Sequence, residues 1–174
     1  MSNPIDNSYW VVPDVLLAGE YPGGGDLDRA RRQLRRLLVG GVSQFIDMTT
    51  AGEHEPYEPV LMEEARLLGV NAVYSNHPVR RHGIPRSPVQ TAAIIREIAE
   101  AAGEGVTTYL HGASGVGRVG LAAGCYLVQS GLPGDRALRK LAILYSAMEK
   151  SAWVPQIPET DQQVEYVRNW NADA

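Results

Sequence analysis

Short runs of β-branched and aromatic residues alternate along this chain with longer segments whose apolar residues recur every three or four positions. The short runs predict strands at 9–12, 15–18, 44–48, 71–75 and 106–110. The longer segments predict helices at 27–39, 59–68, 88–102, 120–129, 135–148 and 160–170. Because strands and helices alternate, we expect a single α/β domain over residues 1–174, with a mostly parallel central sheet flanked by helices.

Two of these helices carry clear end signals. Asp26 is suited to cap the first helix, which stops at Gly40 and Gly41. Ser87 precedes another helix, with Pro88 at its first position. The apolar positions expected to be buried in that helix are Val89, Ala92, Ile94, Ile95 and Ile98.

Composition narrows the class of protein. Of 174 residues, 44% are hydrophobic and 21% are charged, with a formal net charge of -4. This charge does not favour nucleic acid or an anionic membrane as a partner, and no apolar run reaches the roughly 20 residues that span a bilayer. The single cysteine, Cys125, cannot form an internal disulfide, so we expect a cytoplasmic protein. We also expect a monomer.

The first helix carries five arginines on the face opposite its apolar residues, at positions 29, 31, 32, 35 and 36. They form either a solvated helix face, which is the commoner case, or a surface that contacts a polyanion. Sequence does not separate the two.

The segment from 106 to 129 combines the features of an anion site. A strand ends, a loop with Gly112, Gly115 and Gly117 turns, and a helix begins. Loop amides and a helix N-terminus favour negative charge, and Arg118 offers a planar fork for two phosphate oxygens. The alternative is a glycine-rich turn with Arg118 in an internal salt bridge. Under either interpretation, the segment is not a nucleotide-binding loop, because no Gly-Lys-Ser/Thr follows the glycines.

The run from His111 to Gly120 resembles the signature of the protein tyrosine and dual-specificity phosphatase superfamily: His-Cys, five residues, Arg, then Ser or Thr. The resemblance to bacterial dual-specificity-type phosphatases extends to residues 7–13, 17–22, 45–47 and 158–160, with Gln163. It implies that phosphate binds to the loop residues Gly112, Ala113, Ser114, Gly115, Val116, Gly117 and Arg118.

Three positions depart from that pattern. Gly112 stands where the family has its nucleophilic cysteine, and Arg81 stands where it has its general-acid aspartate. Val119 replaces the hydroxyl residue after the arginine. We expect Cys125, two turns into the next helix, to be a core residue rather than a substitute nucleophile. The resemblance therefore implies a retained binding loop without the usual catalytic residues.

Three functional hypotheses follow. The first is a pseudophosphatase that holds a phosphorylated small molecule or a phosphoprotein without turnover and needs no cofactor. The second is a phosphoester hydrolase that uses another nucleophile, such as a metal-bound water. The third is a remodelled or inactivated variant of an active phosphatase. Residues expected near the cleft are His54, Arg80, Arg81, His82 and His111, although the histidine spacing, including His77, matches no known metal motif.

Overall fold

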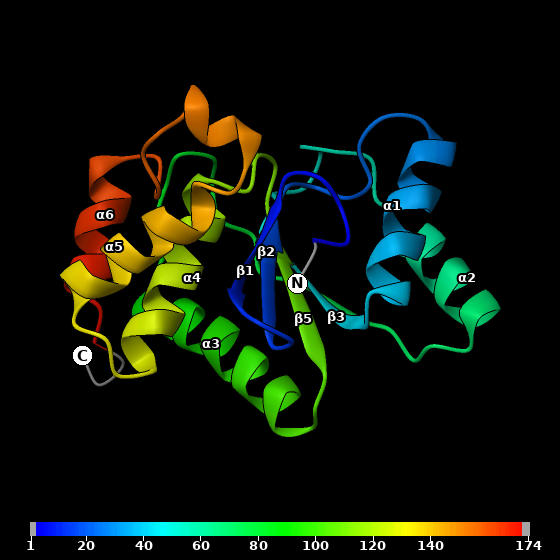
Figure 1. The fold of residues 1–174 in the computed structure, drawn as a ribbon, viewed down its shortest axis with the longest axis horizontal. Helices are drawn as coiled ribbons and strands as arrows, with labels where there is room; N and C mark the ends of the chain where they lie inside the picture. Colours follow the sequence, from blue (N-terminus) through cyan, green and yellow to red (C-terminus); the bar gives the residue numbers. More distant parts are fainter. Residues whose placement is uncertain (1–2, 172–174) are drawn as a thin grey trace.

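The computed structural model describes residues 3–171, which build one five-stranded sheet with helices on both faces (Figure 1). Its strands are β1 (Ser8–Val12), β2 (Leu16–Gly19), β3 (Val42–Asp47), β4 (Val73–Asn76) and β5 (Thr107–His111). The spatial order is β1-β2-β5-β3-β4, and only β1 runs antiparallel to its neighbour. The mostly parallel sheet expected from the sequence is thus confirmed, with β5 at its centre.

Alternating residues along the strands belong to different hydrophobic clusters, because successive side chains point to opposite faces. On β2, for example, Leu16 and Leu17 lie on opposite sides. One face is covered by α1 (Leu27–Val39) and α2 (Glu58–Leu68). The other is covered by α3 (Pro88–Gly103), α4 (Gly117–Gln129) and α5 (Gly134–Tyr145), with α6 (Asp161–Arg168) packed against α4 and α5. A short 3-10 helix, η1 (Glu149–Ala152), links α5 to α6.

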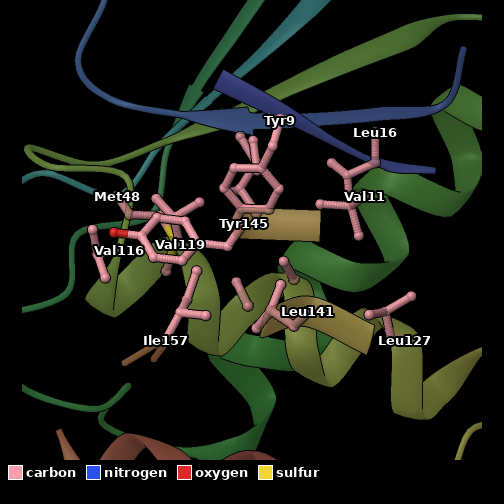
Figure 2. Close-up of a cluster of buried hydrophobic side chains, with 14 of the residues drawn as sticks. Tyr9, Val11, Leu16, Met48, Val116, Val119, Leu127, Leu141, Tyr145 and Ile157 are labelled. Atoms are coloured by element: carbon pink, nitrogen blue, oxygen red, sulfur yellow. The ribbon is translucent and has the colours of Figure 1, made fainter. Parts of the chain in front are cut away.

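The larger cluster anchors the loop that follows β5 (Figure 2). Tyr9 and Tyr145 meet edge to face at its centre, with their ring centroids 5.8 Å apart. Val116, at the end of the loop, and Val119, in the first turn of α4, are buried in the same cluster. Apolar contacts with this cluster therefore fix the position of the loop.

Several boundaries and burial predictions need adjustment. Asp26 caps α1 as expected, accepting a hydrogen bond of 2.7 Å from the amide of Arg29. Helix α4 begins three residues before the predicted start, at Gly117, since the glycine-rich sequence hid its first turn. Val89 was predicted to be buried but is 76% exposed, because it lies in the first turn of α3, beyond the core. Within residues 3–171, no helix is both long and apolar enough to cross a bilayer.

Candidate functional site

The loop between β5 and α4 lies at the carboxyl end of the central strand and forms the floor of a small pocket. Residues Gly112 to Val119 line this floor. Among the hydrogen bonds within residues 3–171, none is donated by the backbone amides of residues 113–119. Buried or half-buried amides without an acceptor are costly, and a helix N-terminus adds partial positive charge. The loop is therefore built to receive hydrogen-bond acceptors, and most favourably an anion.

The glycines of this loop have different reasons to be there. Gly115 has a φ of +75°, and a Cβ there would lie 2.6 Å from the carbonyl carbon of Gly19. Gly112 has no such constraint: a Cβ would meet Val119 at 3.4 Å and Arg118 at 3.6 Å, which are ordinary contacts. The loop conformation therefore requires glycine at 115 but not at 112. The backbone at Gly112 can carry a side chain.

Arg118 is 5% exposed and clamped from one side. Its Nη2 and Nη1 atoms donate to the two carboxylate oxygens of Glu53, at 2.5 and 2.9 Å. Nη1 also donates to the backbone carbonyls of Met48 and Val79, at 3.1 and 3.0 Å. The guanidinium lowers the pKa of Glu53 to about 2, so this carboxylate is charged at neutral pH. The internal salt bridge considered from the sequence therefore exists.

This salt bridge leaves one edge of the guanidinium available. Within the described chain, no acceptor binds the Nε atom of Arg118. A Cβ on Gly112 would lie 3.6 Å from that Nε and 3.9 Å from Cζ, and both residues line the pocket. Because an oxyanion accepts readily from two N–H groups on one edge of arginine, the fork that sequence assigned to phosphate remains usable.

The remaining catalytic positions carry no replacement chemistry. Val119 is 1% exposed and packs in the hydrophobic core, so it contributes only an apolar contact to the floor of the pocket. Cys125 is buried in α4 among apolar residues of α3 and α6, and burial raises the pKa of its thiol far above the ordinary range. This confirms its predicted core role.

The rim of the pocket comes from two distant segments. Arg81 and His82, in the loop after β4, line the pocket together with Glu159, which precedes α6. His82 Nδ1 lies 3.2 Å from the Glu159 carboxylate. The side-chain amide of Gln163 donates to the carbonyl of Gly83 at 2.8 Å, which ties the loop to α6. Arg81 and His82 thus lie at the pocket as predicted, whereas Arg80 does not line it.

The other histidines lie outside this pocket. His54 stacks on Tyr21, with ring centroids 4.3 Å apart, and His77 Nε2 lies 2.7 Å from Glu97. His111 is fully buried beneath the loop, with Nε2 2.6 Å from the Tyr57 hydroxyl. Burial lowers the pKa of His111 to about 4, so this ring is neutral at pH 7 and serves to support the loop. Across residues 3–171, no three His, Cys, Asp or Glu side chains gather as metal ligands.

Two positioning residues were not assigned from the sequence. Glu53 orients Arg118 from a position 65 residues away. Lys150, in η1, donates to the carbonyl of Ser114 at 3.0 Å and to the Glu20 carboxylate at 2.8 Å. No local motif marks either residue, because both act through long-range contacts.

Comparison with known proteins identifies this arrangement. A family model described as the "Swiss Army Knife" protein DSP-PTPase phosphatase domain matches residues 6–168. A structure of kinase associated phosphatase, with its catalytic cysteine replaced by serine, is 21% identical with a TM-score of 0.73, over 96% of this chain and 94% of that one. PTPMT1 in complex with PI(5)P is 17% identical with a TM-score of 0.66, over 94% of this chain and 93% of that one. TpbA of P. aeruginosa is 16% identical with a TM-score of 0.68, over 99% of this chain and 90% of that one. No curated protein matches the sequence.

Proposed function

The chain belongs to the dual-specificity-type phosphatase family, and from this premise we propose that it is a pseudophosphatase, which binds a phosphate monoester without hydrolysing it. The observation that carries the proposal is the row of unpaired amides at 113–119 beside the free edge of Arg118. These groups recognise phosphate oxygens by charge-assisted hydrogen bonds. They do not depend on a nucleophile.

The absence of turnover follows from the chemistry of the residues present. The family mechanism needs a thiolate at the position of Gly112, which has no side chain. It also needs an acid to protonate the leaving oxygen, and the arginine at position 81 remains cationic at neutral pH. Removing the thiolate also removes a negative charge that would repel a phosphate dianion. Binding can therefore persist where catalysis does not.

The ligand that we propose is a phosphorylated small molecule or a phosphoprotein. The pocket volume is only about 10 Å³, about enough for one water molecule. A phosphate is larger, and we propose that the exposed rim residues Arg81 and His82 move outward when it binds. Two of the similar proteins have been solved with phosphorylated ligands, PTPMT1 with PI(5)P and TpbA with pTyr.

Isothermal titration with O-phosphotyrosine and with orthovanadate tests this proposal. The wild-type protein should bind both. Arg118→Met combined with Glu53→Gln removes both partners of the salt bridge, so no unpaired charge is left behind, and it should abolish binding. Circular dichroism of the double variant checks that the fold persists. The proposal fails if the wild type binds neither ligand, or if the folded double variant binds them equally well.

One observation favours a second candidate function, the hydrolysis of a phosphoester without a cysteine nucleophile. His82, held by Glu159 at the rim, is the one histidine that lines the pocket within the described residues, and a histidine–carboxylate pair can accept a proton from water. Under this alternative, the wild-type protein would release inorganic phosphate, and His82→Ala would abolish that release. A phosphate-release assay distinguishes the two functions.

A further inference from the structure

The arginines of α1 divide into two groups in the structure. Arg31 bonds to Glu63 and Glu64 of α2, and Arg35 bonds to Glu64. Within residues 3–171, by contrast, Arg29, Arg32 and Arg36 pair with no carboxylate. Two of the five arginines thus join α1 to α2. The other three have no carboxylate partner in the described part of the chain and are available to bind an anionic group.

Two hollows adjoin this side of α1, and both are lined by Arg32 and Arg36. The larger, about 660 Å³, lies between the C-terminal half of α1 and β1 and is also lined by Trp10 and Val39. The smaller, about 350 Å³, extends toward Glu20. Neither hollow shares a residue with the pocket at Gly112. This side of α1 is therefore a separate surface.

The larger hollow joins cations to apolar surface. Val39 is 72% exposed, and the half-buried Trp10 stands on the opposite side from the helix. The unpaired Arg32 and Arg36 line the hollow, together with Arg35, whose charge Glu64 already compensates. Among the described residues, the one acid in its lining is Asp14. The protein as a whole carries a net charge of -4, so this local excess of positive charge runs against the overall balance. Such a surface is complementary to carboxylates that flank an apolar side chain.

We propose that the hollow between α1 and β1 binds an acidic peptide segment of a partner protein. Carboxylates of the peptide contact Arg32 and Arg36, where planar guanidinium groups favour bidentate hydrogen bonds. An apolar side chain of the peptide lies between Trp10 and Val39 and is thereby removed from water. The smaller hollow carries acidic residues of its own, including Glu20 and Glu149, so the larger one is the binding site.

A capped pentapeptide with two glutamates, two aspartates and a central leucine is the probe. We expect it to bind the wild-type protein with a change in tryptophan fluorescence that is lost in Trp10→Phe, while calorimetry still detects binding to that variant. Arg32→Glu with Arg36→Glu should weaken binding at least about tenfold. The same charge change on α5, Arg136→Glu with Arg139→Glu, should leave binding unchanged.

The competing outcomes are distinct. Equal binding of the glutamine and asparagine counterpart of the peptide would overturn the proposal, as would equal loss in both double variants, which would indicate only a general effect of charge. If tripolyphosphate binds more tightly than the peptide and depends on Arg32 and Arg36, the proposal is overturned, and the ligand of this hollow is a polyphosphate. In the described chain, the pocket at Gly112 shares no residue with this hollow. Arg32→Glu with Arg36→Glu should therefore leave O-phosphotyrosine binding unchanged, so the failure of one proposal does not imply the failure of the other.

Discussion

Glu53 binds both terminal nitrogens of Arg118, at 2.9 and 2.5 Å, and leaves the Nε edge of the guanidinium beside Gly112. The carboxylate therefore fixes the orientation of the arginine and does not occupy the edge that faces the pocket. A buried arginine without such a partner would be free to turn away from the loop, and its charge would be uncompensated. Glu53 is in this sense part of the binding site, although it does not line the pocket.

The Glu53–Arg118 pair should make stability depend on pH on the acid side. The pKa of Glu53 is lowered from 4.5 to about 2 in the folded protein, so its contribution is fully present above pH 4.5 and is lost as the pH falls toward 2. Glu53→Gln should destabilise the protein at pH 7 and reduce the loss of stability between pH 5 and 3. Urea unfolding at several pH values measures both effects.

A matched control is Glu63→Gln, which removes a partly exposed partner of Arg31. Exposed pairs contribute only about 0 to 1 kcal/mol, so the stability curve of this variant should follow the wild type closely. Equal behaviour of the two variants would show that the Glu53–Arg118 pair has no special role in stability.

The two loop glycines should respond differently to the same substitution. Gly112→Ala should leave stability unchanged or raise it by up to about 1 kcal/mol, because the backbone accepts a Cβ and the unfolded chain loses freedom. Gly115→Ala should destabilise by more than about 1 kcal/mol, because its φ is +75° and the Cβ would overlap with the backbone of Gly19. Thermal unfolding of both variants provides the comparison, and a similar cost at both positions would contradict the loop geometry.

The same geometry predicts that a nucleophile can be rebuilt. Gly112→Cys should introduce a thiol that reacts with a disulfide reagent in the folded protein, while Cys125 reacts only after unfolding. Gly112→Cys combined with Arg81→Asp supplies both missing groups and should hydrolyse an aryl phosphate, whereas Gly112→Cys alone should be much slower. Inactivity of a folded double variant would show that more than these two positions has changed.

Glu159 should weaken phosphate binding in the wild-type protein. A Cβ on Gly117 would lie 3.0 Å from the Glu159 carboxylate, which places this negative charge beside the unpaired amides. Glu159→Gln should raise the affinity for orthovanadate about 2- to 5-fold, an effect that shrinks at high salt. Glu100→Gln, on the exposed face of α3, removes the same charge at a distance and should change nothing. An unchanged affinity for Glu159→Gln would contradict the idea that this carboxylate acts on the bound anion.

Local patterns predicted much of the fold. The strands and helices followed from alternating and periodic apolar residues, and the Asp26 cap was visible from its residue type. The early start of α4 was missed because glycine is unfavourable in a helix; a Cβ at Gly117 would lie only 3.1 Å from the Gln163 side chain of α6. Glu53 and Lys150 were not assigned their roles, since their contacts join segments far apart in the sequence. The resemblance placed His54 near the cleft, but its ring stacks on Tyr21 and it does not line the pocket.

The central claim is that this loop binds phosphate but does not cleave its ester. Phosphorus NMR of O-phosphotyrosine, recorded over several hours with stoichiometric wild-type protein, tests both parts at once. We predict a broadened and shifted ester resonance, sharpened again by Arg118→Met with Glu53→Gln, and no growth of inorganic phosphate. An unperturbed ester resonance, or inorganic phosphate that grows in proportion to protein concentration, would contradict the claim.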